Sequence, residues 1–160
     1  MTQFHHAFRT SAFDVTVTPT VTNGIYAAGD IMGGLMTFPV SKWEGAPVFI
    51  SGVQVVIKAA VAPNLRLILF NADPTATTKT DNAAYSLNAA DAFKLIRAIA
   101  LPASGLTDHG TPNSYESDAV NCVVQLASTS INVYGLLIDD LGVTLTSTSD
   151  VQVRLRGEAS

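Results

Sequence analysis

Apolar and polar side chains alternate along much of the chain, a pattern typical of strands that bury one face. Residues 13–22 alternate Phe and Val with Asp and Thr. Pro19 predicts an edge strand or a break there, because proline cannot donate a ladder hydrogen bond. Residues 151–156 alternate in the same way, with Val151, Val153 and Leu155 on the face that we expect to be buried. The alternation therefore predicts a sheet-forming chain.

The longest apolar segment, residues 48–61, predicts a strand with Val53, Val55 and Ile57 on one face. A Pro-Asn turn separates this segment from LRLILF, so we expect the two to form a hairpin. Further strands are expected in IMGGLMTF, NCVVQLAS, INVYGLLIDD and GVTLTS. The two adjacent glycines of the first of these, Gly33 and Gly34, indicate a bulge or a close backbone approach.

Helical character is confined to residues 88–97, where Asn88 is a suitable N-cap, and the same residues could instead lead into a strand that ends at Pro102. Two polar, turn-rich segments, residues 71–83 and 102–118, are expected to be surface loops. Loops of this length are usually ordered either by function or by a neighbouring chain.

These patterns predict an all-β protein: a single-domain antiparallel β-sandwich, jelly-roll-like, with at most one short helix. A closed barrel has the same strand spacing and stays open as an alternative. The domain is expected to span residues 12–160, after an N-terminal arm of residues 1–11. The arm carries Phe4 and Phe8, and it either packs on its own core edge or reaches a neighbour.

Composition changes the picture at the surface. The 160 residues are 48% hydrophobic but only 14% charged, against a usual charged share of about 25%. Such a surface is often covered in part by other chains, although a monomer with a Thr/Ser/Asn-rich surface is the alternative. The net charge is −4 and the few Lys and Arg are scattered, which argues against nucleic-acid binding. No apolar run approaches the length of a membrane span, and no signal-peptide pattern opens the chain, so we expect synthesis in the cytoplasm.

Motifs for catalysis are weak. GDIMGG has glycines but no following Lys-Ser/Thr, and no G-x-S-x-G motif is present. His109 lies in a Gly-containing loop and the other two histidines lie in the arm, so none has an evident orienting partner. The neighbouring carboxylates Asp139 and Asp140 point to opposite faces if they are in a strand. Cys122 is expected to be a small buried hydrophobe. We therefore expect no enzyme activity, no cofactor and no catalytic residues.

Oxygen-bearing side chains in residues 71–83, including Asp73 and Asp81, could hold a calcium ion, but their spacing matches no EF-hand and an Asx-Pro turn accounts for them equally well. No metal site is assigned. Aromatic residues are more often core or interface anchors than a sugar-stacking platform. Phe4, Phe8, Trp43 and Tyr115 are the candidate interface residues, because they lie in the arm or in segments expected to be loops.

Three segments together resemble small virion structural proteins of tailed bacteriophages: NGIYAAGDIMGGLMTF, LILFNADPTATTKTDNAAYSLNAADAFKLI and YGLLIDD. The resemblance spans residues 20–140, and its most distinctive part is FNADPT followed by TDNAA and then D-x-x-K-L. The arm and the last strand lie outside it.

This resemblance implies a virion location and a non-enzymatic decoration (cement) protein on the outside of the phage head. It further implies a homotrimer bound to the major capsid protein. Another virion position, at the neck or tail, and a glycan-binding host-attachment module are the alternatives. The resemblance implies no residue with a defined mechanism.

Overall fold

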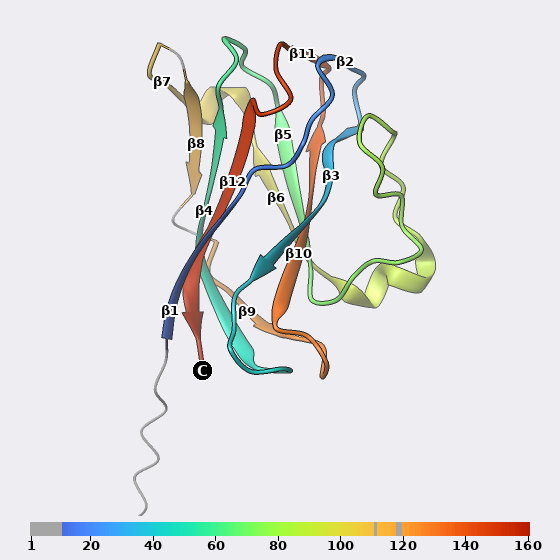
Figure 1. Cartoon of the computed structure of the whole chain (residues 1–160), viewed down its shortest axis with the longest axis vertical. Helices are drawn as coiled ribbons and strands as arrows, with labels where there is room; N and C mark the ends of the chain where they lie inside the picture. Colours follow the sequence, from blue (N-terminus) through green and yellow to red (C-terminus); the bar gives the residue numbers. More distant parts are fainter. Residues whose placement is uncertain (1–10, 111, 118–119) are drawn as a thin grey trace, which may run out of the picture.

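The computed structural model describes residues 11–110, 112–117 and 120–160, and its fold is an all-β sandwich of two antiparallel sheets, as the sequence predicts (Figure 1). The first sheet has the order β1-β12-β4-β8-β7, with β9 pairing β4 beside β8. Its strands are β1 (Ser11–Val17), β4 (Pro47–Ile57), β7 (Leu106–Asp108), β8 (Asn113–Ser117), β9 (Cys122–Gln125) and β12 (Val151–Ala159).

The second sheet has the order β3-β10-β5-β6. Its strands are β3 (Asp30–Pro39), β5 (Leu65–Phe70), β6 (Leu95–Leu101) and β10 (Asn132–Asp139). A two-stranded ribbon of β2 (Gly24–Tyr26) and β11 (Val143–Leu145) closes one end of the sandwich (Figure 1). Two short 3-10 segments, η1 (Ala89–Lys94) and η2 (Ala103–Gly105), are the helical content of the described residues.

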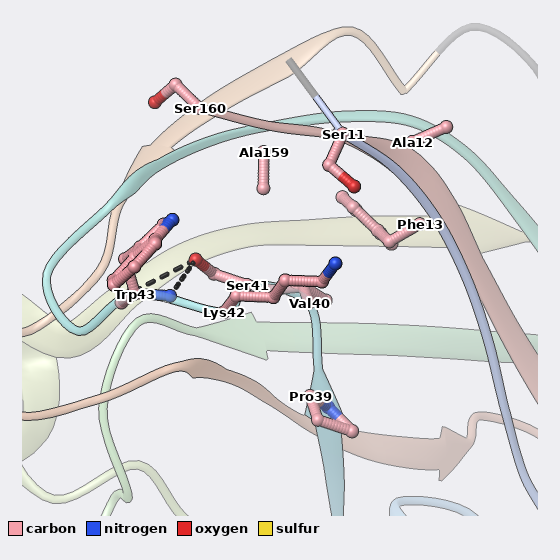
Figure 2. A pocket seen from close by; sticks show the side chains of 10 residues that line it. All are labelled: Ser11, Ala12, Phe13, Pro39, Val40, Ser41, Lys42, Trp43, Ala159 and Ser160. Carbon is pink, nitrogen blue, oxygen red and sulfur yellow. Dashed lines mark hydrogen bonds between the residues drawn. The ribbon is translucent and has the colours of Figure 1, made fainter. Parts of the chain in front are cut away.

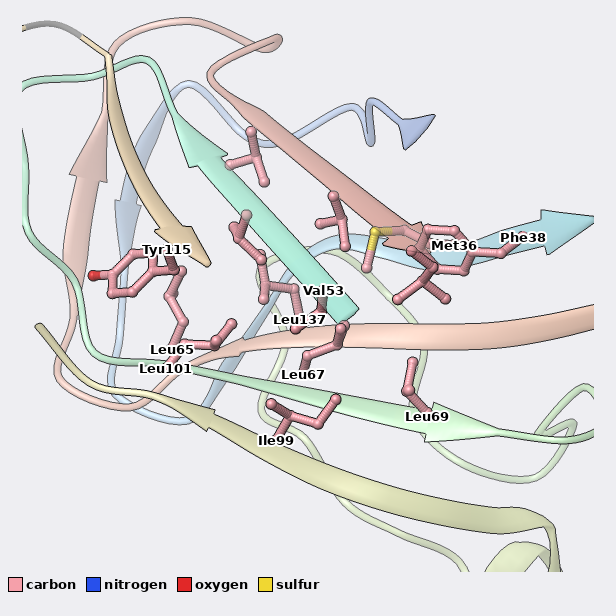
Figure 3. Close-up of a cluster of buried hydrophobic side chains, with 14 of the residues drawn as sticks. Met36, Phe38, Val53, Leu65, Leu67, Leu69, Ile99, Leu101, Tyr115 and Leu137 are labelled. Atoms are coloured by element: carbon pink, nitrogen blue, oxygen red, sulfur yellow. The ribbon is translucent and has the colours of Figure 1, made fainter. Parts of the chain in front are cut away.

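The main core lies between the two sheets and is built by the predicted alternation (Figure 3). Val53, Val55 and Ile57 of β4 are fully buried, as predicted, and face side chains of β5 and β10 such as Leu67 and Leu137. On β12 the predicted inward residues are likewise fully buried. β1 pairs only with β12 and ends before Pro19, which confirms the prediction of an edge strand. Ser11, assigned to the arm from the sequence, is already the first residue of β1.

The predicted irregularity at Gly33 and Gly34 is present as a bulge. Both residues have positive φ angles, 78° and 72°, and the register of β3 against β10 shifts between Gly135 and Leu137. A Cβ atom on Gly33 would collide with Pro19, and one on Gly34 would lie 3.1 Å from the carbonyl oxygen of Lys79. Glycine is needed here both for the backbone angle and for the close approach.

The predicted hairpin of residues 48–61 with LRLILF is wrong, because β4 and β5 lie in different sheets. β4 ends at Ile57, and both of its edges are taken: by β12 on one side and by β8 and β9 on the other. The Lys58 amide donates to the carbonyl oxygen of Asp150, and the chain then crosses to the second sheet. Two strongly buried strands in sequence can belong to facing sheets as readily as to one, and the apolar pattern does not distinguish these cases.

Residues 88–101 satisfy both alternatives in turn: Asn88 caps the 3-10 segment η1 by accepting from the Ala90 amide, and β6 follows until Pro102. The expectation that residues 102–118 form one surface loop is wrong in part, because β7 and β8 pair within them and β8 joins β4. The sequence of β8, NSYES, is too polar to stand out as a strand.

Residues 71–88, here called the covering loop, pack over the outer face of the second sheet (Figure 1). They cover a second hydrophobic cluster, separate from the main core and here called the outer cluster. Its buried members are Ile31, Ile68, Phe70, Leu136 and Ile138, with Leu35, Tyr85, Leu87 and Tyr134 packed against them. The first predicted long loop is therefore ordered by the domain itself.

Candidate interaction surfaces

His109 makes the one contact in the described residues that resembles part of a catalytic pair: its Nε2 lies 3.1 Å from the Ser114 hydroxyl. A hydrolase triad needs a third group that orients the histidine. The nearby carboxylate of Asp108 instead accepts from the backbone amide of Gly110, at 2.7 Å. Ser114 is buried, and neither residue lines the three depressions described below. The contact therefore lacks the setting of a nucleophile and base.

The paired acids Asp139 and Asp140 point in different directions, as expected for neighbours at a strand end. Asp140 forms an exposed ion pair with Arg66 at 2.9 Å. Asp139 is fully buried, and burial raises the pKa of its carboxyl although backbone amides of Leu141 and Gly142 oppose the shift. Its Oδ2 atom has no hydrogen-bond partner in the structure. The two carboxyls therefore do not form a working acid–base pair.

Asp81 ties the covering loop to the sandwich. Its carboxylate accepts from the Thr22 hydroxyl and the Tyr26 hydroxyl, each at 2.7 Å, and from the backbone amide of Gly33. Burial, with a further contribution from Asp81, raises the pKa of Tyr26. This carboxylate was a candidate calcium ligand in the sequence, and in the structure it serves as the acceptor for three protein donors.

Asp91, a buried acid of η1, ties the first half of the covering loop to η1. It accepts from the amides of Ala76 and Thr77, from the Thr77 hydroxyl and from the Lys94 ammonium. The lysine and these donors lower the pKa of Asp91 to about 2. Asp73, the other calcium candidate, pairs with Lys79 at 2.8 Å. In the described residues no group of three or more His, Cys, Asp or Glu is placed to bind a metal ion.

The four tyrosines, all of which lie in described residues, do not form an exposed stacking platform. Tyr26 and Tyr115 are buried in the main core, and Tyr85 and Tyr134 pack against the outer cluster. The Tyr115 hydroxyl donates to the carbonyl oxygen of Pro63, and burial, followed by the charge of Asp139, raises its pKa to about 12. The interpretation of Tyr115 as an interface residue is therefore wrong for this fold, because its ring anchors β8 in the core.

Trp43, by contrast, is 72% exposed, at the end of the sandwich where Ser11 and Ser160 lie (Figure 2). The Ser41 side chain both accepts from the Trp43 amide and donates to its carbonyl oxygen, which fixes the loop that carries the ring. Phe49 and Val123 form an exposed cross-strand pair at the same end, and Val123 is 75% exposed. We call this region the arm-end surface: Phe13, Pro39, Trp43, Pro47, Phe49, Val123 and Ser160.

Two depressions mark the arm-end surface. The first, of about 170 Å³, lies between the β1–β12 edge and the β3–β4 connection, and Phe13, Val40 and Trp43 are among its walls (Figure 2). The second, of about 180 Å³, is lined by Pro47, Val48, Phe49, Val123, Glu158 and Ser160. Ser160 lines both, so the two depressions are neighbours.

Large apolar side chains are also exposed at the opposite end. Ile25 is 74% exposed on β2, and Leu141 is 66% exposed just before β11. Leu141 lines an open depression with Val61, Ala62 and Pro63, and Thr144, which pairs with Ile25, lines the same depression. We call Ile25, Leu141 and residues 61–63 the far-end surface.

Away from the exposed pair Phe49 and Val123, the outer face of the first sheet carries ion pairs. Arg154 forms a two-pronged ion pair with Asp14 on β1, and Arg156 pairs with Glu116 on β8. Asp14 has a lowered pKa, chiefly because it accepts from Arg154. Exposed apolar side chains are therefore concentrated at the two ends of the sandwich, apart from Phe93 and Leu95 beside η1.

Of the four interface residues predicted from the sequence, Trp43 lies on an exposed surface and Tyr115 does not. Phe4 and Phe8 lie outside the described residues. The sequence reasoning missed Phe49, Val123, Ile25 and Leu141. Val123 follows Cys122 in a continuous apolar run, so nothing in the pattern indicates which side chain faces out. Cys122 itself is half-buried and packs against the main core.

Comparison with known proteins gives no match to this chain, whether with protein families, curated sequences or solved structures. Within the part of the chain that the structure describes, no helix is long and apolar enough to cross a membrane.

Proposed function

We propose that this protein is a non-enzymatic virion structural protein that decorates the head of a tailed bacteriophage. It would bind the major capsid protein from outside and act as a homotrimer. The observation that carries the proposal is the placement of most of the large exposed apolar side chains at two opposite ends of the sandwich. A protein with apolar contact surfaces at both ends is suited to bridging two neighbouring chains.

The physical requirements of such a role are modest. A decoration protein stabilises a shell by binding the assembled form more tightly than the free subunits, which needs affinity and no chemistry. Both apolar ends carry the kind of side chain that forms the centre of protein interfaces. The far-end surface, with Ile25 and Leu141, is the proposed contact with the shell, because a cyclic trimer can present three copies of it on one side.

The test uses heads that lack the protein. Purified full-length chain is added, and binding is measured by co-sedimentation and by resistance of the heads to heat or osmotic shock. The double variant Ile25→Ser with Leu141→Ser is expected to stay folded and to lose binding at least tenfold, because it replaces two exposed apolar contacts. Phe93→Ser is the matched control, since it removes a 98% exposed aromatic ring elsewhere on the domain.

Two results would contradict the decoration role. Imaging of particles could place the chain at the neck or the tail and leave the head surface bare. Alternatively, the wild-type chain could bind without protecting the heads. A glycan-binding role is disfavoured by the burial of the tyrosines, and specific binding to a cell-surface glycan through Trp43 would favour it again.

A further inference from the structure

The two depressions of the arm-end surface are each of a size that takes one aromatic ring. Their volumes are about 170 Å³ and about 180 Å³. An apolar cavity of about 150 Å³ is large enough to bind benzene. Their walls are largely apolar, with Phe13 and Trp43 at the first and Phe49 and Val123 at the second. The surface is therefore shaped for two neighbouring aromatic side chains.

The ten residues that precede β1 carry two such side chains. Phe4 and Phe8 are four positions apart in MTQFHHAFRT. In an extended segment, residues i and i+4 point to the same side, about 13 Å apart. An extended arm would thus present both rings to one surface, with His5, Ala7 and Arg9 facing away.

The geometry disfavours docking of the arm on its own domain. Ser11 lines the first depression and pairs with Ala159, so the chain joins β1 at the edge of the site itself. Phe8 is only three residues away, and it could enter the depression only if the chain reversed at once. Residues 1–10 contain no Gly, Pro, Asn or Asp, the residues that favour tight turns. Ten extended residues instead reach up to roughly 33–36 Å, far enough to meet a neighbouring domain.

We propose that the arm-end surface is the binding site for residues 1–10 of a second copy of this chain, with Phe4 and Phe8 in the two depressions. Each chain gives its arm to the next chain and accepts the arm of the preceding one. Such head-to-tail contacts close into a ring when the rotation between copies is suitable. The inference rests on the proposed function in that it supplies the self-contact of the homotrimer and leaves the far-end surface for the shell.

The receiving surface is largely prepared for this contact. The two hydrogen bonds of Ser41 hold the Trp43 backbone, so the loop that carries the exposed ring needs little ordering when a partner covers it. Buried aromatic side chains are the usual energetic centre of a protein interface.

The decisive experiment is a disulfide test between two different chains, both carrying Cys122→Ser to remove the native thiol. One chain carries His6→Cys and a tag, because His6 lies between Phe4 and Phe8 on the same side of an extended arm and leaves both rings in place. The other carries Ser160→Cys without a tag, since Ser160 lines both depressions. The two are co-expressed and oxidised, and the products are identified by mass. We expect a covalent heterodimer. In the matched control, Thr144→Cys at the far end replaces Ser160→Cys, and we expect no heterodimer.

Two outcomes would overturn the inference. If the mixed chains do not cross-link while a single chain carrying both cysteines closes on itself, the arm docks on its own domain. If neither cross-link forms, although both chains show wild-type unfolding curves, the arm does not reach this surface.

A measurement of mass in solution gives an independent check. Phe8→Ala is expected to weaken self-association roughly tenfold to a hundredfold, because the interface loses the free energy of burying one aromatic side chain. At a concentration near the wild-type dissociation constant, the mass should fall towards that of one 16.8 kDa chain. Phe93→Ala should leave the mass unchanged. An unchanged mass for Phe8→Ala would contradict the inference.

Head binding by a chain that does not self-associate would contradict the inference alone, whereas a cross-linked ring that fails to bind heads would contradict the proposed function alone.

Discussion

The outer faces of the two sheets are made compatible with solvent in two different ways. The first sheet presents ion pairs such as Arg154–Asp14 to solvent and carries no cover. The second sheet presents Ile68, Phe70 and Leu136, and the covering loop packs over them. The first face meets water through its own charged side chains, whereas the second is shielded by a loop that the carboxylates of Asp81 and Asp91 hold in place.

This difference accounts for part of the unusual composition. A chain with 48% hydrophobic and 14% charged residues suggests a surface covered by other chains. In the structure five buried and four partly buried apolar residues belong to the outer cluster, which the same chain covers. A low charged share can thus indicate a second core as well as an interface. Which of the two is present depends on whether a loop of the same chain covers the apolar face.

The largest effect is expected from removing the centre of the outer cluster. Phe70→Ala should lower the free energy of unfolding by about 3–5 kcal/mol, the usual cost of such a truncation in a packed core. Urea denaturation measures it. Gln54→Ala, on the outer face of the first sheet, should change stability by less than about 0.5 kcal/mol. Equal effects of the two substitutions would show that the loop-covered face is not a core.

A smaller but more local effect is expected at the anchor of the covering loop. Asp81→Ala removes the acceptor for Thr22, Tyr26 and the Gly33 amide, and we expect a loss of about 2–3 kcal/mol. Hydrogen exchange should rise first at residues 71–88. Thr148→Ala, in a surface turn outside the covering loop, is the control. Uniform exchange over the whole domain would contradict a local anchoring role.

Asp139 is a buried carboxyl whose pKa is raised, whereas the pKa of the buried carboxyl of Asp91 is lowered. Because burial raises the pKa of Asp139, the folded state prefers its neutral form. Its contribution to stability is fully present below the ordinary value of 3.8 and is lost as the pH rises through the raised folded pKa. Asp139→Asn should therefore flatten the pH profile of the unfolding free energy and stabilise the protein at pH 7. A variant less stable than wild type at pH 7 would show that the charged form is the preferred one.

The smallest effect is expected on the uncovered face. Asp14→Asn breaks the ion pair with Arg154, whose side chains are 47% and 40% exposed. Exposed pairs contribute little after solvent screening and side-chain ordering. The thermal unfolding midpoint should therefore stay within experimental error of the wild type, at low and at high salt. A clear loss of stability would show that this face depends on its charges.

The strands were predictable wherever burial on one face leaves an alternating pattern. β1, β4 and β12 follow that pattern, and the two-glycine bulge was predictable because glycine weakens a strand unless its backbone freedom is needed there. Strand partners were not predictable: the β4–β5 hairpin failed because pairing depends on which edges later strands occupy. β8 was missed because its buried residues include Asn113 and Ser114.

The candidate surfaces were less predictable than the fold. Trp43 was found because its segment, PVSKWEGAP, is typical of a loop, where a large aromatic ring is a candidate for an interface. Tyr115 sits in an equally polar segment, yet its hydroxyl reaches Pro63 and its ring enters the core. Whether an aromatic residue faces out is decided by contacts with residues distant in sequence, and a single sequence carries little record of them.

The last strand in sequence, β12, lies between β1 and β4, and Ser11 pairs with Ala159. During synthesis at about 5–20 residues per second, β1 must wait roughly 7–30 s for its partner to be made. β10 is likewise late, and it separates β3 from β5. Neither sheet can therefore be completed until most of these residues have left the ribosome. Folding should then be slow, in the millisecond-to-second range of chains dominated by distant pairings.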